Sequence, residues 1–353
     1  MFVRVAILPI VAGVVLGVLA PVLVYMGNPG NMGMCAACFT RDIAGGIGLH
    51  HVATLQYIRP EIIGIVLGAL IASLIFGEFK ARGGSAPILR FGFGVFGMIG
   101  ALVFLGCPWR MILRLSGGDL SALAGLGGLV VGILCGLFFI KRGFSLSAST
   151  PTNRIVGLIF PAFMVLLFVL LLLGVFGESS IIAFSQKGPG SMHAPLFFSL
   201  IAGLVLGAVL QKSRFCTVAA VRNVVFARDY GILQGVLAFF ITALVLNMAL
   251  GFFHLGFENQ PIAHNDTLWN FLSMVLCGLC FSIGGGCPGR QLVLAGEGNS
   301  DSAIFIFGLL FGAALAHNFA LASSPNGITE NAPIAVILGL VFCVLVALFA
   351  KKN

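Results

Sequence analysis

The chain has 353 residues, of which 59% are hydrophobic and only 8% are charged, and its formal net charge is +8. So little charge cannot cover the surface of a soluble globule of this length, which argues against a soluble enzyme or binding module. The positive charge alone could indicate nucleic-acid binding. However, the basic residues are distributed over alternate loops, as membrane topology requires, and we expect no nucleic-acid partner.

About ten apolar stretches approach the roughly 20 residues that a helix needs to cross a bilayer. In chain order they lie near residues 6–26, 61–77, 88–106, 120–140, 155–177, 195–210, 231–253, 268–286, 302–321 and 332–350. The first could be mistaken for a signal peptide, but no Ala-x-Ala cleavage site ends it. The sequence therefore predicts an all-α polytopic membrane protein with nine or ten transmembrane helices.

The distribution of Lys and Arg predicts the orientation. With ten crossings, fourteen of them fall on one side: Arg4, Lys80, Arg82, Arg90, Lys141, Arg142, Arg154, Lys212, Arg214, Arg222, Arg228, Arg290, Lys351 and Lys352. Five fall on the other: Arg41, Arg59, Arg110, Arg114 and Lys187. By the positive-inside rule, both termini are cytoplasmic, and we expect a multi-pass protein of the inner membrane.

A Gly-Cys-Pro-x-Arg motif occurs twice, at residues 106–110 and 286–290, each time at the end of an apolar run. The duplication predicts two repeats, residues 1–178 and 179–353, with about five transmembrane helices each. Because five is odd, the second repeat starts on the opposite side of the membrane, and the repeats are inverted. Many transporters are built in this way and bind substrate at broken helices between the repeats. A miscount by one crossing would make the repeats parallel.

Each motif places a cysteine, Cys107 or Cys287, at a helix start, because proline is favoured in the first turn. Free backbone N–H groups and the positive end of the helix dipole favour an anion there. Gly106 and Gly286 allow a ligand to approach closely, and a thiol can donate its S–H to a soft acceptor such as sulfur. The alternative is a glycine-proline helix break with an incidental cysteine. The Gly-Cys-Pro motif occurs in both halves of the chain, which favours a role of its cysteines in binding an anion.

Another cysteine, Cys35 or Cys216, precedes each motif by about 70 residues. These cysteines begin the segments 35–48 and 216–227, which are too short and too polar to cross a bilayer. Short re-entrant or interfacial helices are the form that such segments take in membrane proteins.

Four arginines accompany these cysteines: Arg41 and Arg222 lie six residues after the first cysteine of each half, and Arg110 and Arg290 lie three residues after the second. An arginine inside a membrane protein is energetically expensive, and it is usually functional for that reason. We expect the four to attract or clamp an anion. The alternative is that their side chains extend to the membrane interface.

Cys35 and Cys38 form a Cys-x-x-Cys, and so do Cys277 and Cys280. The second pair lies in a spanning stretch and is explained by helix packing, whereas the first could cycle between thiol and disulfide. An alternative function is therefore a membrane thiol–disulfide oxidoreductase that uses Cys35 and Cys38 with a quinone. An oxidoreductase needs only one such pair, so the duplication favours transport instead.

The sequence contains no Walker-type phosphate loop, no dinucleotide fingerprint and no His-Glu-x-x-His. We expect neither a cofactor nor a metal site, and no ATP-driven pump.

The doubled motif, the Arg214–Thr217 stretch and the repeated hydropathy resemble the YeeE/YedE family of sulfur-compound transporters over roughly residues 5–350. The Met34–Phe39 element is more similar to the YedE branch, which is associated with selenium metabolism. The resemblance implies a non-enzymatic importer of a thiosulfate-like anion, and a covalent persulfide step is conceivable but not required. It also implies a small cytoplasmic sulfur-carrier partner of the TusA type.

Carried over to this sequence, the resemblance makes Cys107, Cys216 and Cys287 the central cysteines along which the anion passes, joined by Cys35 and Cys38. The expected function is import of a small sulfur- or selenium-containing anion. The anion would meet Cys35 and Cys107 from the outer side and Cys216 and Cys287 from the inner side. Helix N-termini and arginines would offset its charge.

Overall fold

The computed structural model describes residues 5–177 and 182–350, which are mostly helical. The helices are α1 (Ile7–Tyr25), α2 (Ala36–Gly46), α3 (Pro60–Ile75), α4 (Pro87–Val103), α5 (Pro108–Ser116), α6 (Ala122–Lys141), α7 (Arg154–Phe176), α8 (Leu196–Ser213), α9 (Thr217–Ala227), α10 (Gly231–Ala249), α11 (Thr267–Ile283), α12 (Pro288–Gly296), α13 (Ser300–Asn318) and α14 (Ala332–Phe349). Two short strands, β1 (Arg82–Gly83) and β2 (Thr150–Pro151), pair antiparallel. The all-α membrane fold predicted from the sequence is confirmed.

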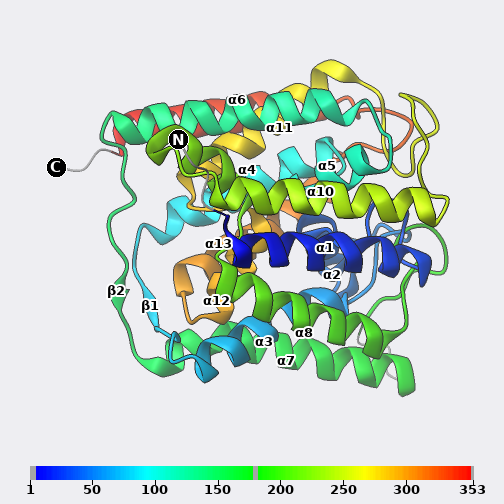
Figure 1. Ribbon diagram of the computed structural model, residues 1–353, viewed down its shortest axis with the longest axis horizontal. Helices are drawn as coiled ribbons and strands as arrows, with labels where there is room; N and C mark the ends of the chain where they lie inside the picture. Colours follow the sequence, from blue (N-terminus) through cyan, green and yellow to red (C-terminus); the bar gives the residue numbers. More distant parts are fainter. Residues whose placement is uncertain (1–4, 178–181, 351–353) are drawn as a thin grey trace.

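Nine helical segments in the described ranges are long and apolar enough to cross a bilayer. Three of these join a long helix to a short one, α4 to α5, α8 to α9 and α11 to α12, over 30, 32 and 30 residues. The remaining predicted stretch forms α3, which is apolar but has only 16 residues. The long helices run roughly alongside one another (Figure 1).

Glycines bring the long helices into close contact. A Cβ atom at Gly128 or Gly132 of α6 would collide with backbone carbonyl oxygens of Phe271 and Val275 on α11. Lipid supplies no hydrophobic driving force between helices, and small residues at the interface increase the packing contacts that hold them together. Close backbone approach therefore contributes directly to the stability of this bundle.

The long helices pack across the two halves of the chain. Helix α1 packs against α10 and α3 against α8, while α6 packs against α11 and α4 against α13. Each pair joins a helix of the first half to one of the second, so the halves share one interior. The predicted boundary between residues 178 and 179 lies outside the described residues.

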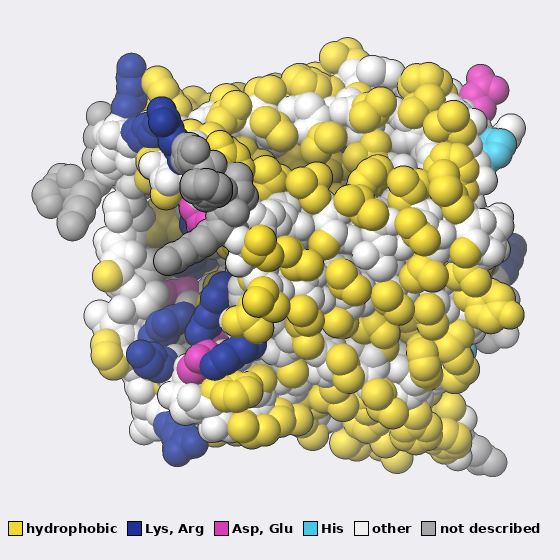
Figure 2. Space-filling view, in the orientation of Figure 1, with side chains coloured by type: hydrophobic (Ala, Val, Ile, Leu, Met, Phe, Trp, Pro, Cys, Tyr) yellow, Lys and Arg dark blue, Asp and Glu magenta, His cyan; other side chains and the backbone are white. Residues whose placement is uncertain are grey.

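Helix α1 begins and α14 ends on the same side of the molecule, where β1 and β2 also lie (Figure 1). Lys and Arg side chains gather at that side, and hydrophobic side chains cover much of the rest of the visible face (Figure 2). Arg4, Lys351 and Lys352, which the charge count assigned to this side, lie outside the described residues.

Four of the five basic residues assigned to the opposite side are not loop charges. Arg59, Arg110 and Arg114 are fully buried and Arg41 is 2% exposed, so that only Lys187 is exposed. The count of loop charges on that side was therefore wrong, because these guanidinium groups lie inside the protein.

Candidate functional site

Four cysteines occupy the same position, the residue that caps the N-terminus of a short helix. Cys35 caps α2, Cys107 caps α5, Cys216 caps α9 and Cys287 caps α12. Proline is the first residue of α5 and of α12, as the Gly-Cys-Pro motif predicts. All four side chains are at most 3% exposed. Each thiol therefore lies beside the backbone N–H groups of a first helical turn, at the positive end of a helix.

The four thiols form two pairs, one in each half of the chain. The Sγ atoms of Cys35 and Cys107 are 3.6 Å apart, and those of Cys216 and Cys287 are 3.7 Å apart. In the second pair, the backbone N–H of Cys287 also donates to Cys216 Sγ at 3.5 Å. All four are free thiols. The cysteines of each half that are about 70 residues apart in sequence are thus brought into contact.

Cys38 lies one turn into α2 beside the first thiol pair. Its backbone N–H donates to Cys35 Sγ at 3.3 Å, and its own Sγ accepts a hydrogen bond from Arg110 at 3.5 Å. The Cys35-to-Cys38 element thus joins a thiol of the pair to a guanidinium group. No group of three or more His, Cys, Asp or Glu side chains in the described part of the chain could hold a metal ion.

Arg110 is fully buried, and its charge has no carboxylate partner among the described residues. Besides Cys38 Sγ, its guanidinium donates to the carbonyl oxygen of Ile262 at 2.8 Å, and its Nε has no partner there. A buried charge without an opposite charge is costly. This arginine can therefore stabilise a bound anion strongly.

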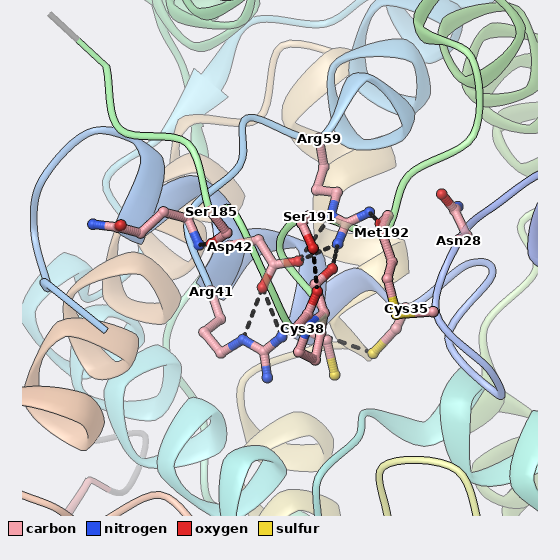
Figure 3. Close-up of polar contacts among 12 residues, drawn as sticks. Asn28, Cys35, Cys38, Arg41, Asp42, Arg59, Ser185, Ser191 and Met192 are labelled. Atoms are coloured by element: carbon pink, nitrogen blue, oxygen red, sulfur yellow. Dashed lines mark hydrogen bonds and ion pairs between the residues drawn. The ribbon is translucent and has the colours of Figure 1, made fainter. Parts of the chain in front are cut away.

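Arg41, by contrast, belongs to a buried ion network. Arg41 and Arg59 both donate to the carboxylate of Asp42, at 2.6 and 2.8 Å, as Figure 3 shows. Arg59 also donates to the carbonyl oxygens of Pro189 and Met192. These contacts tie α2 to the loop before α8, which gives Arg41 a structural role in the contacts described.

Arg114 and Asp119 form a second buried ion pair at 2.6 Å. Arg114 also donates to the carbonyl oxygen of Phe104 and to the Ser121 hydroxyl. The pair closes the C-terminal end of α5 and so holds the short helix that carries Arg110. Sequence reasoning did not identify Asp42, Asp119 or Arg114 as part of the site, although acidic residues so close to arginines in an apolar chain were a signal for pairing.

Arg290 lies in a different electrostatic setting from Arg110. Its guanidinium is 3.3 Å from Glu297, which also binds Arg214 at 2.7 Å. A cavity of about 450 Å³ reaches Arg290 and is lined by Gly77, Glu78, Lys80, Arg82, Arg214, Arg290 and Glu297. It is on the side of the molecule where Figure 2 shows Lys and Arg clustered. Hydrogen bonds from Gln211 and Lys212 lower the pKa of Glu78, so this carboxylate remains ionised at neutral pH.

The spacing of glycine and arginine that the two motif copies share has a packing explanation. A Cβ at Gly106 would lie 3.0 Å from side-chain carbons of Arg110, and one at Gly286 would lie 3.3 Å from those of Arg290. Each glycine therefore lets the arginine side chain lie back over the start of its helix. Arg222, on α9, is half-buried, and none of the ion pairs found in the described ranges includes it.

The comparison with family models gives one match. Residues 212–351, from the end of α8 to just beyond α14, match a family model described as sulphur transport. No curated protein matches the chain. The matched part contains Cys216, Cys287 and Arg290, and with the apolar helices it fits a membrane transporter of a sulfur compound.

Proposed function

We propose that the protein imports a small sulfur-containing anion of the thiosulfate type across the inner membrane. The observation that carries the proposal is Arg110, a buried cation with no carboxylate partner in residues 5–177 and 182–350, whose guanidinium contacts the Cys38 thiol beside the pair of Cys35 and Cys107. A cation and several S–H donors suit an anion that has both charged oxygens and a soft sulfur atom. Selenosulfate has the same chemical character, so the selenium-containing analogue falls within the proposal.

The anion would pass from one thiol pair to the other. Cys35 and Cys107 would receive it from the side opposite to the chain termini, and Cys216 and Cys287 would then pass it towards Arg290 and the basic cavity. In this proposal, residues 1–178 and 179–353 are inverted repeats. The recurring helix pairs and the thiol pair in each half support this division.

The clustering of Lys and Arg near the ends of α1 and α14 supports cytoplasmic termini by the positive-inside rule. The cavity at Arg290 would then open to the cytoplasm. A small sulfur-carrier protein of the TusA type, receiving the sulfur compound there, is part of the proposal. Arg222 would contribute to the positive potential on this side, and Arg41 would act by fixing the helix that carries Cys35 and Cys38.

The alternative considered above was a thiol–disulfide oxidoreductase using Cys35 and Cys38. The match to a sulphur-transport model favours a transporter over an enzyme.

Uptake of labelled thiosulfate by single-cysteine variants tests the proposal. Replacing Cys107, Cys216 or Cys287 with Ala, in a strain without other thiosulfate importers, should reduce uptake at least about tenfold, because each removes a sulfur contact from a buried path. Cys135→Ala is the matched control, since Cys135 is exposed on the outer surface of α6. Undiminished uptake in all three variants would contradict the proposal.

Uptake of thiosulfate, sulfite, sulfate, selenite and selenosulfate into proteoliposomes, compared side by side, identifies the anion.

A further inference from the structure

The two motif copies differ at one inner position, where the first has Trp109 and the second has Gly289. The structure brings these two residues together. A Cβ at Gly289 would overlap Cζ2, Cη2 and Cε2 of the Trp109 ring, so the indole occupies the space that the glycine leaves free. Trp109 belongs to the first turn of α5 and Gly289 to the first turn of α12. The indole therefore spans from the start of one short helix to the start of the other.

The contact of Trp109 with Gly289 joins the segment that follows Cys107 to the segment that follows Cys287. Trp109 is two residues from Cys107, and Gly289 is two residues from Cys287. Each of these cysteines contacts the other thiol of its own half. The Trp109 ring therefore fills the space between two helix starts, one that begins after Cys107 and one that begins after Cys287.

The indole also carries a polar group, the Nε1–H. Trp109 is 1% exposed, and its Nε1–H has no hydrogen-bond partner among the described residues. Buried indole N–H groups usually have a partner, because a buried donor without one loses the hydrogen bond that it would make to water. Nε1 is bonded to Cε2, one of the ring atoms against Gly289, so the free donor lies at the ring edge that faces α12.

We propose that Trp109 is the barrier between the two thiol pairs and that its N–H donates a hydrogen bond to the anion as the anion passes. The hydrogen-bond part rests on the proposed function, whereas the barrier part does not. The closed ring separates the two sides in the absence of substrate. An anion that accepts a hydrogen bond from the indole N–H supplies the missing partner. The barrier therefore selects for ions that can accept hydrogen bonds from Trp109.

The hydrogen bond is tested with Trp109→Phe, which keeps an aromatic ring but removes the donor. We expect the KM for thiosulfate uptake to rise about tenfold, as the loss of a hydrogen bond to a charged group predicts. Trp269→Phe, at the only other tryptophan, is the matched control and should leave KM unchanged. In the Trp269→Phe protein, thiosulfate should also shift the fluorescence of Trp109 in a saturable way, and sulfate should do so less. An unchanged KM in Trp109→Phe, or no fluorescence change in a protein that transports, overturns the assignment.

The barrier is tested by thiol accessibility, without any transport measurement. In a background with Cys35, Cys38 and Cys107 replaced by Ser, a membrane-impermeant anionic methanethiosulfonate is added from the side of Lys187. Modification of Cys287, measured by mass spectrometry, should be slow with Trp109 or Phe at position 109. It should be at least about tenfold faster in Trp109→Ala, or in Trp109→Leu if the Ala variant does not accumulate in the membrane. Equal rates in all variants contradict the barrier.

The uptake and accessibility experiments distinguish a failure of the proposed function from a failure of the role proposed for Trp109. If the unaltered protein takes up no thiosulfate, the proposed function fails, and the accessibility rates still decide the barrier. If uptake depends on Cys107 and Cys287, but neither the KM nor the modification rate of Cys287 changes with the residue at 109, the proposed function stands and the role of Trp109 is refuted.

Discussion

Arg110 and Arg290 occupy the same place in two copies of one motif, yet their charges are balanced differently. Arg290 shares Glu297 with Arg214, whereas Arg110 has sulfur and a backbone carbonyl as partners in the described part of the chain. An anion near Arg110 meets an unneutralised cation, and one near Arg290 must compete with a resident carboxylate. In the proposed transport route, this difference favours tight binding of the anion at the first thiol pair and its release at the second.

Arg110 can be tested by two substitutions. Arg110→Gln removes the buried charge and should raise the KM for thiosulfate about tenfold or more, because charge-assisted hydrogen bonds are the strong ones. Arg110→Lys keeps the charge but not the planar fork, so we expect an intermediate value. Uptake at several substrate concentrations measures the effect.

Arg142→Gln is the control for these variants, since Arg142 is exposed at the end of α6. A KM for Arg110→Gln that equals the KM of this control would show that Arg110 does not bind the substrate.

At this scale the sequence was informative about local geometry and less so about partners. Gly-Cys-Pro predicted cysteines at helix starts, and Cys107 and Cys287 are indeed the N-terminal caps of α5 and α12. The pairing of Glu297 with Arg214 could not be assigned in the same way, because the two residues are distant in sequence and an ion pair depends on where side chains meet after folding. That Arg110 has no acidic partner among the residues that the structure describes is likewise visible only in the folded chain.

Among the elements, the short helices α2, α5, α9 and α12 are the ones that carry the thiols. The sequence predicted two of them as segments too polar to cross, and it predicted the other two as helices broken at Gly-Cys-Pro. The pairing of α2 with α5 and of α9 with α12 through their capping thiols agrees with the spacing of the cysteines in the two halves. The contact between Trp109 and Gly289 was not predicted, because no local pattern reports which helix starts face each other.

The packing of α6 against α11 gives a prediction with a built-in control. Gly128→Ala should lower the free energy of unfolding by about 1–3 kcal/mol, because its Cβ would collide with the carbonyl oxygen of Phe271. Gly127→Ala should have little effect, since its Cβ would be 3.7 Å from the Phe271 ring, an ordinary contact. Thermal unfolding of the purified proteins in detergent compares the two. Equal melting temperatures would contradict this close approach of the helices.

For the whole molecule, hydropathy predicted the membrane class and the spanning segments well, because the bilayer imposes a length and a polarity on each segment. It did not predict which helices are neighbours, such as α1 with α10 or α3 with α8. Most spanning segments are apolar all round, so their sequences carry little information on which face meets another helix. In the structure, glycines at the contact points account for which helices pack together.

The orientation of the whole molecule can be checked by labelling. Lys187 is exposed in the loop before α8, and Lys141 is exposed at the end of α6. The start of α8 and the end of α6 lie on opposite sides of the bundle (Figure 1), so Lys187→Cys and Lys141→Cys, each in a Cys135→Ser background, place a thiol on either side. If the termini are cytoplasmic, an impermeant maleimide added to intact cells should label the first variant after the outer membrane is permeabilised. The second variant should react only after lysis. The reverse pattern would invert the proposed direction of transport.

The contact of Trp109 with Gly289 also has a consequence for how such a protein can be assembled. A dimer of two identical half-length chains would place the same residue twice at this point. Two indoles would collide there, and two glycines would leave a hole. A single polypeptide that carries both motif copies avoids this restriction, because the large and the small residue can be encoded separately. The contact of a large residue with a small one therefore needs two motif copies that differ in sequence, and this polypeptide carries both.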